Sequence, residues 1–270
     1  MTHGKAAFTA LVLAGQRPGM DPLARHCGMD LKCMVPVAGL PMLQRVVTTL
    51  DRNDAIQRIF VSLPAPSALD DLEALAPLRQ NGRLQAVQSA SSPSASVAEF
   101  CKTHWQAGEP LLVTTADHVL LNDEILGLFL DQARKNGGDI AAGLTPSAPL
   151  KAAYPTSKRT YLHFRDEAYS GANLFALLTP RAQSAVAFWQ GVEQDRKKPW
   201  RIARRVGMKA LIAYLARRLT LEEAMQALSK AAGAEARAVI LPIAEAAIDV
   251  DKPEDLTLVE TILAEQAANT

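Results

Sequence analysis

The sequence alternates short apolar runs of strand length with longer stretches that carry a helical pattern. Strands are predicted at residues 8–13, 57–63, 83–88, 111–115 and 139–145, and helices at residues 41–52, 67–76, 94–106 and 123–136. Strands and helices that alternate at this length predict a mostly parallel sheet with right-handed crossovers. The expected fold is therefore a Rossmann-like three-layer α/β/α arrangement. Residues 111–115, nearly all apolar or β-branched, are typical of a central strand covered on both faces.

The second half of the chain departs from this alternation. Residues 146–157 contain three prolines and two serines and predict a long surface loop. Further elements are expected in chain order: added antiparallel strands at 160–164 and 172–178, a helical stretch at 199–232, short strands at 238–242 and 246–250, and a last helix at 252–266. No repeat or linker divides the 270 residues, so one domain (1–270) with a helical lobe at about 196–233 is expected.

The composition excludes several classes of protein. The formal net charge of +1 gives no overall field that would attract nucleic acid. The three cysteines show no CxxC spacing, which argues against disulfide or zinc frameworks and favours a reducing, cytoplasmic location. No apolar run approaches the ~18 residues of a membrane span. The run after Lys5 leads straight into a glycine turn, so a strand is expected there rather than a cleaved leader.

The first predicted strand ends in a glycine turn that basic residues follow. The motif is Leu13-Ala-Gly-x-Arg17, and Lys32 comes shortly before Val35-Pro-Val-Ala-Gly-x-Pro41. Glycine lets backbone N–H groups approach phosphate oxygens, and positive side chains strengthen that contact. Ligands of open α/β sheets bind beyond the carboxyl ends of the strands. These features predict a nucleoside triphosphate site. GxGxxG and GxxxxGK[ST] motifs are absent, which excludes a dinucleotide site of the Rossmann type and a P-loop.

Two carboxylates, one directly after a predicted strand and one on a short predicted strand, are candidate magnesium ligands. Asp117 comes directly after the central strand, and Asp249 belongs to the segment Asp249-Val-Asp251. Asp251 precedes Lys-Pro-Glu254, which predicts a helix N-cap with a capping box and a structural role for Asp251. Asp249 is then the freer carboxylate. Mg²⁺ prefers one or two carboxylates together with phosphate oxygens, so Asp117 and Asp249 are predicted to bind it. The alternative for Asp117 is a hydrogen bond within its own loop.

Six pieces of the chain, in order, resemble the MobA-like nucleotidyltransferases, with some likeness to sugar-phosphate nucleotidyltransferases. They are Leu13-Ala-Gly-x-Arg17, Lys32 with 35–41, Ser94–Val97, Thr115-Ala-Asp117, Ser170-Gly-Ala-Asn173 and Asp249–Leu256. The resemblance implies a nucleotide-diphospho-sugar transferase-like fold. It also implies Mg²⁺-dependent transfer of a nucleoside monophosphate from a triphosphate, with CTP or GTP favoured. The implied acceptor is a phosphorylated small molecule, and pyrophosphate is released.

The resemblance also implies roles for single residues of the predicted pocket. Base and ribose would contact Leu13, Ala14, Gly15, Ser94 and Ser96; the triphosphate would contact Arg17 and Lys32; the metal would bind Asp117 and Asp249; the acceptor would lie beside Gly171 and Asn173. Apart from the resemblance, Lys158, with Lys151, Arg159 and Arg165, flanks the acceptor region and is the first choice to receive its phosphate; a solvated loop is the alternative for these four residues. Gln16 stands where many members have a second glycine, and the long loop at 16–31 differs from the molybdopterin enzymes.

Two other functions and one surface remain open from the sequence. Asp249-Val-Asp251 is a DxD sequence, as in glycosyltransferases that use nucleotide sugars, but it leads into a predicted helix cap. A non-catalytic nucleotide-binding protein is the other alternative. Residues 196–209 contain seven Lys or Arg residues and no acid. A basic amphipathic segment at 196–215 can make weak contact with an anionic membrane surface or help to hold an anionic acceptor, and a solvated basic face is the first alternative to both.

Overall fold

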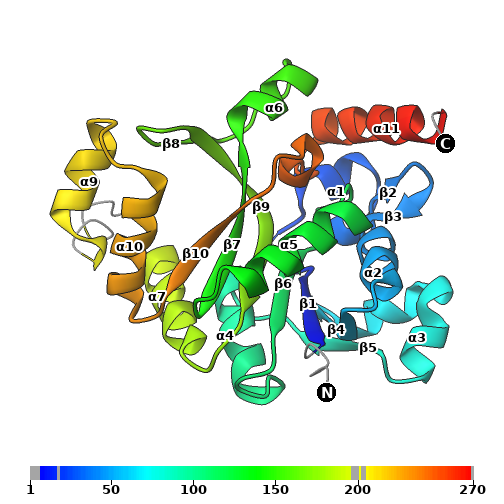
Figure 1. Cartoon of the computed structure of the whole chain (residues 1–270). Helices are drawn as coiled ribbons and strands as arrows, with labels where there is room; N and C mark the ends of the chain where they lie inside the picture. The colour runs from blue at the N-terminus through cyan, green and yellow to red at the C-terminus, as the bar shows by residue number, and fades with distance from the viewer. Residues whose placement is uncertain (1–6, 17–18, 196–200, 202–204, 269–270) are drawn as a thin grey trace, which may run out of the picture.

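The computed structural model describes residues 7–16, 19–195, 201 and 205–268. Within them, eight strands form one sheet with the order β10-β7-β9-β6-β1-β4-β5, and β8 pairs with β9 (Figure 1). The strands of this sheet are β1 (Phe8–Leu13), β4 (Ile56–Leu63), β5 (Leu84–Gln88), β6 (Leu111–Thr115), β7 (Ile140–Pro146), β8 (Leu162–His163), β9 (Ala168–Leu177) and β10 (Ala236–Ile240). A separate hairpin consists of β2 (Pro36–Val37) and β3 (Leu40–Pro41).

Most of the sheet is parallel. β1 pairs in parallel with β4 and β6, β4 with β5, and β10 with β7. β9 runs antiparallel to β6 and β7, and β8 runs antiparallel to β9. The predicted parallel sheet with antiparallel additions is therefore confirmed. After β1 the chain adds β4 and β5 on one side and then β6 on the other, so strand order reverses at β1 and β6. Their carboxyl ends lie side by side, with Leu13 opposite Thr115.

Helices cover both faces of the sheet, which confirms the three layers. The described helices are α1 (Pro22–His26), α2 (Met42–Arg52), α3 (Ala76–Gln80), α4 (Pro93–Thr103), α5 (Asp123–Lys135), α6 (Ser147–Ala153), α7 (Ala182–Gln194), α9 (Met208–Leu215), α10 (Leu221–Ala232) and α11 (Pro253–Ala268). Successive residues of a strand face opposite sides. Val12 of β1 accordingly packs in the cluster that contains Leu43 of α2 and Phe129 of α5. Leu11 packs in the cluster that contains Phe100 of α4 and Val186 of α7.

A further apolar cluster lies beneath the loops at the carboxyl ends of the strands. It joins Leu23 of α1, Val35, Val119, Val250 and Ile262 of α11, which come from distant parts of the sequence. All five side chains are buried, with Val119 the most exposed at 5%. This cluster fixes the loop after β1, the loop after β6 and the segment before α11 relative to one another.

Several predicted elements differ from the structure. The predicted loop at 146–157 contains helix α6, whose Pro149 lies in the first turn, where its missing N–H costs no hydrogen bond. The predicted helix at 67–76 is instead the pair of 3₁₀ turns Pro66–Asp71 and Glu73–Leu75. Helix α3 begins only at Ala76 and extends five residues, with Pro77 in its first turn.

Three further differences between prediction and structure concern the last third of the chain. Residues 246–250 are not a strand: a 3₁₀ turn covers Ala244–Ala247, and Asp249 follows it in irregular structure. Helix α7 was not predicted at all. The single helical stretch expected at 199–232 is interrupted, since α9 follows Gly207 at a φ of 114° and α10 begins anew with a capping box at Thr220. Residues 196–200 and 202–204 lie outside the described residues.

No helix in the described part of the chain combines the length and apolar character needed to cross a bilayer. Helices α9 and α10 lie at the left of Figure 1, where α10 packs against α7 and β10.

Candidate functional site

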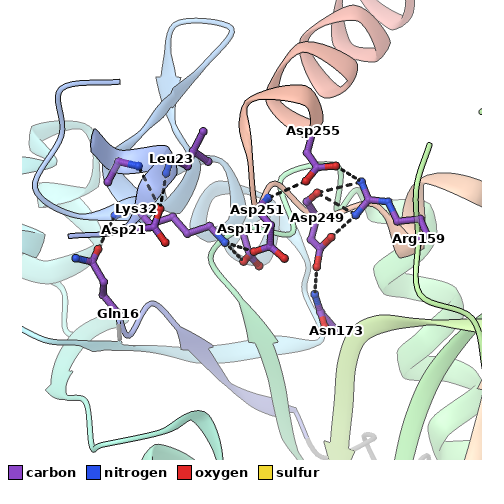
Figure 2. A network of polar contacts seen from close by, with 11 residues as sticks. Gln16, Asp21, Leu23, Lys32, Asp117, Arg159, Asn173, Asp249, Asp251 and Asp255 are labelled. Atoms are coloured by element: carbon purple, nitrogen blue, oxygen red, sulfur yellow. Dashed lines mark hydrogen bonds and ion pairs between the residues drawn. The ribbon is translucent and has the colours of Figure 1, made fainter. Parts of the chain in front are cut away.

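The carboxyl ends of β1 and β6 hold a lysine between two aspartates. Lys32 lies in the 3₁₀ turn Lys32–Met34, and its Nζ is 2.7 Å from Oδ2 of Asp117 (Figure 2). The same ammonium also pairs with Oδ1 of Asp251. Burial alone would lower the pKa of Lys32, but the two carboxylates and their hydrogen bonds raise it above its ordinary value. Lys32 therefore stays protonated at the point where the sequence predicted a phosphate-binding cation.

The loop that carries Lys32 is closed by the side chain of Gln16. Its Oε1 accepts a hydrogen bond from the backbone N–H of Lys32 at 3.0 Å. Its Nε2 donates to the carbonyl oxygens of Gly19 and Asp30. The residue that replaces the family's second glycine thus shapes the long loop. Asp21 then caps α1 by accepting from the N–H groups of Leu23 and Ala24.

One backbone hydrogen bond brings the two acidic segments together. The N–H of Val250 donates to the carbonyl of Asp117 at 3.1 Å, which places Asp249 and Asp251 beside the loop after β6. Oδ2 of Asp117 accepts from Lys32, whereas its Oδ1 is buried and has no hydrogen-bond partner among the described residues. A buried carboxylate oxygen without a donor is costly unless something else satisfies it.

Asp249 is held from the other side by Arg159 and Asn173 (Figure 2). Arg159 pairs with Oδ1 of Asp249 and, at 3.0 Å, with Oδ1 of Asp255. Nδ2 of Asn173 donates to Oδ2 of Asp249 at 3.1 Å. Burial and the nearby charges of Asp117 and Asp251 raise the pKa of Asp249, although Arg159 and Asn173 oppose this. Three carboxylates are thus close enough to disfavour one another as anions.

The predicted structural role of Asp251 is wrong. Its side chain does not cap the last helix but pairs with Lys32, and it is 64% exposed. Helix α11 begins at Pro253, so its third residue is Asp255 rather than Glu254. Oδ2 of Asp255 accepts from the N–H of Asp251 at 3.2 Å, which is the reciprocal half of a capping box displaced by one residue. A one-residue error in the helix start therefore gave Asp251 a capping role that it does not have and missed the contact of Asp255 with the helix start.

A pocket of about 1050 Å³ opens beside Lys32 and is large enough for a nucleotide. Its wall has three parts: the loop after β1 with Leu13, Gly15, Gln16 and Gly19–Pro22; the cation site with Lys32, Thr115, Asp117 and Asp251; and the far wall with Ala90–Ser96, Gln190, Glu193 and Gln194. Leu13 and Gly15, which were predicted to contact the nucleoside, line the pocket, whereas Ala14 beside them is buried.

The predicted base-binding serines line this pocket, but their hydroxyls are engaged within the protein. Oγ of Ser94 donates to Oε2 of Glu193, and Oγ of Ser96 accepts from the N–H of Ala90 at 2.9 Å. They therefore build the wall of the pocket. Sequence reasoning missed Glu193 because helix α7, which carries it, was not predicted.

The remaining predicted residues are not among the described residues that line the pocket. Arg17 lies outside the described residues. Gly171 on β9 and Lys158 are exposed. Arg159 was predicted among the cations that flank an acceptor phosphate, but it is 7% exposed and its guanidinium is taken by two carboxylates. That prediction is wrong for Arg159.

The acidic cluster suits a hard divalent cation, although it is not a closed metal site. The described residues contain no group of three or more histidine, cysteine, aspartate or glutamate side chains arranged to hold a metal ion. Lys32 and Arg159 balance much of the negative charge instead. The unpartnered Oδ1 of Asp117 and the raised pKa of Asp249 are nevertheless typical of a carboxylate pair that a further cation would stabilise.

Comparison with known proteins agrees with this geometry. The model of the MobA-like NTP transferase domain matches residues 10–245. The chain belongs to the MobA-like NTP transferase family. The predicted family is confirmed, and membership identifies the chain as a nucleotidyltransferase. No curated protein matches the sequence.

Solved structures support the same fold. A structure described as a hypothetical transferase from Thermus thermophilus has a TM-score of 0.76 and 27% identity, covering 93% of this chain and 99% of that one. A 4-diphosphocytidyl-2C-methyl-D-erythritol synthase from Anaerococcus prevotii has a TM-score of 0.59 and 13% identity, covering 96% and 99%. A CMP:2-keto-3-deoxy-manno-octonic acid synthetase complexed with CTP has a TM-score of 0.58 and 14% identity, covering 96% and 100%. The predicted nucleotide-diphospho-sugar transferase-like fold is confirmed.

Replacing Arg159 should destabilise the protein strongly. Arg159→Met leaves the carboxylates of Asp249 and Asp255 partly buried without their cation, which costs about 3–5 kcal/mol of unfolding free energy. Urea denaturation followed by circular dichroism measures this. Arg237→Met is the matched control, because its ion pair with Glu235 is half-exposed and its loss should change little. Equal stability of the two variants would contradict the role given to Arg159.

Proposed function

We propose that this protein transfers a nucleoside monophosphate from CTP or GTP to a phosphorylated small molecule, with release of pyrophosphate and dependence on Mg²⁺. The observation that carries the proposal is the protonated Lys32, held by Asp117 and Asp251 where strand order reverses and a nucleotide-sized pocket opens. Ligands of open α/β sheets bind at this kind of position.

Lys32 is proposed to bind the triphosphate. When a nucleotide enters, phosphate oxygens compete with the two carboxylates for its ammonium. Because the side chain of Lys32 is only 18% exposed, its charge is less screened than that of a surface lysine. Gly15 and Leu13 would lie against the nucleoside, and Arg17 remains a proposed second cation for the phosphates.

The proposed reaction is one in-line displacement. A phosphate oxygen of the acceptor attacks the α-phosphorus of the nucleotide, the new O–P bond forms, and the bond to the bridging oxygen of pyrophosphate breaks. Pyrophosphate leaves with the electron pair, and Lys32 neutralises the charge that grows on it. A phosphate monoester is already nucleophilic at neutral pH, so no side chain needs to take a proton. Positioning and charge neutralisation then supply most of the catalysis.

The carboxylates of Asp117 and Asp249 are proposed to hold Mg²⁺, with Asp251 beside them. A bound Mg²⁺ would reduce the repulsion between acceptor and α-phosphate oxygens. The contribution of the chain itself is to fix its ligands: Arg159 and Asn173 orient Asp249, and the backbone of Val250 ties this segment to Asp117. The acceptor is proposed to lie on the same side as Asn173, near the exposed Gly171 and Lys158.

Removing the charge of either Lys32 or Asp117 should abolish most turnover. Lys32→Met and Asp117→Asn are each expected to lower the rate of pyrophosphate release by about 10²–10³-fold. The assay combines each of four nucleoside triphosphates with a panel of phosphorylated small molecules. Lys102→Met is the matched control, because Lys102 makes only an exposed pair with Glu99 on α4. Full turnover in the Asp117 variant, with folding verified by circular dichroism, would overturn the proposed role. Release of sugar from a nucleotide sugar instead would favour the glycosyltransferase alternative.

Helix α9 carries exposed apolar side chains, which support the proposal that it makes weak contact with an anionic membrane surface. α9 exposes Met208, Ile212 and Leu215, with 53%, 60% and 71% of each residue accessible, at spacings that place them on one side of the helix. Among the neighbouring cations, Arg201 and Arg205 pair with Asp195, which reduces the free positive charge. Contact is therefore proposed to be weak and sensitive to salt.

Flotation with anionic vesicles tests this surface. The wild-type protein is expected to float with the vesicles at low salt and to be released at high salt, because surface charges are screened. The double variant Ile212→Glu and Leu215→Glu should not float. Vesicles of zwitterionic lipid are the control. Absence of wild-type binding to anionic vesicles at low salt would contradict the proposal.

A further inference from the structure

The far wall of the pocket carries one acidic side chain, Glu193, whose position depends on two helices. Glu193 lies near the end of α7 and reaches the N-terminus of α4, which packs against α7. Its Oε2 accepts from Oγ of Ser92 at 2.7 Å, from the N–H of Ser94 at 3.3 Å, and from Oγ of Ser94. Three donors on one oxygen fix the carboxylate firmly in the wall.

The other oxygen of Glu193 is not used in this way. Oε1 has no hydrogen-bond partner among the described residues, and a carboxylate oxygen can accept two hydrogen bonds. Gln190 and Gln194 lie three residues before and one after Glu193 on α7, and both line the pocket as well. The far wall therefore offers a fixed acceptor flanked by two amides that can donate or accept.

An acid is an unusual choice for the wall of a pocket that receives a polyanion. Its charge repels phosphates, so Glu193 opposes binding unless it meets a hydrogen-bond donor of the ligand. The proposed function puts the phosphates beside Lys32, in the part of the pocket that the loops after β1 and β6 line. The far wall, formed by α4 and α7, is then left for the nucleobase. Cytosine, guanine and adenine each carry an exocyclic amino group, which donates hydrogen bonds. At the position of the cytosine amino group, uracil carries a carbonyl oxygen, which only accepts.

We propose that Glu193 is the residue that determines base specificity, with Oε1 accepting a hydrogen bond from the exocyclic amino group of the base. The inference rests on the proposed nucleotidyl transfer and deepens it by naming the substrate class. Nucleotides with an amino-bearing base are accepted, and their oxo or deamino counterparts are rejected: CTP over UTP, or GTP over ITP. A carboxylate facing the carbonyl of uracil leaves two acceptors together without a proton between them.

The test compares nucleotides that differ only in this amino group. Calorimetric titration with CTP, UTP, GTP and ITP in the presence of Mg²⁺ gives the four dissociation constants. For the pair that the wild-type protein binds more tightly, we expect the amino-bearing member to bind about 10- to 100-fold better, as for a hydrogen bond to a charged group. In Glu193→Gln this ratio should fall to one or below, because the three donors keep the amide oxygen at the position of Oε2 and the amide nitrogen at the position of Oε1 cannot accept from the amino group.

Two control variants separate recognition from structure. Ser94→Ala removes a donor to Glu193 but keeps the carboxylate, so the ratio should persist even if both nucleotides bind more weakly. Glu99→Gln removes an exposed carboxylate from the same helix α4 and should change nothing. If Glu193 only joins α4 to α7, then Glu193→Gln weakens both nucleotides equally with an unchanged ratio, and the inference fails.

The failure of this inference can be distinguished from failure of the proposed function. A wild-type protein that binds and consumes both members of each pair alike overturns the role of Glu193 and leaves nucleotidyl transfer standing. A protein that binds none of the four nucleotides overturns both.

Discussion

The half-buried ion pair between Lys32 and its two aspartates is the interaction on which the rest of the site depends. It joins Lys32 to Asp117, which lies 85 positions later in the sequence, and to Asp251, which lies 219 positions later. Charges removed from water are costly unless they are paired and hydrogen-bonded. Once the loops bring Asp117 and Asp251 together, they need a cation, and Lys32 needs them. The arrangement holds a positive charge at the mouth of the pocket without neutralising it permanently, since phosphate oxygens can replace carboxylates as its partners.

The surrounding structure keeps this balance in place. The apolar cluster of Leu23, Val35, Val119, Val250 and Ile262 fixes the three loops that carry the charges. Arg159 completes the arrangement from the acceptor side, where it balances Asp249 and Asp255. Four carboxylates are thus served by two cations whose positions are set by separate parts of the chain. The resulting surplus of negative charge at Asp117 and Asp249 is what favours an additional cation between them.

Much of the fold could be predicted from the sequence because it is written in local patterns. The apolar runs of β1, β4 and β6 and the helical patterns of α4 and α5 identify their elements directly. Asp117 was found because it directly follows a strand of that sheet, and Lys32 because it comes between the first glycine turn and the motif at 35–41. Asp251 was misjudged because its role depends on where α11 begins, and one residue decides which carboxylate caps the helix.

Other parts of the site were not accessible from local pattern. Arg159 resembled a solvated cation, and only tertiary packing buries it between two aspartates. Glu193 could not be placed because its partners Ser92 and Ser94 lie about a hundred residues earlier, and nothing near Glu193 in the sequence points to them. Gln16 carried a signal as a departure from the family pattern, but its hydrogen bonds across the loop became evident only in three dimensions.

The most direct test of this account is a crystal structure with a non-hydrolysable nucleoside triphosphate and Mn²⁺ in place of Mg²⁺. Anomalous scattering should locate the metal between Asp117 and Asp249, and Nζ of Lys32 should lie against phosphate oxygens rather than against both aspartates. A nucleotide bound in the pocket with no metal at these carboxylates, and with Lys32 still paired to Asp117 and Asp251, would contradict it.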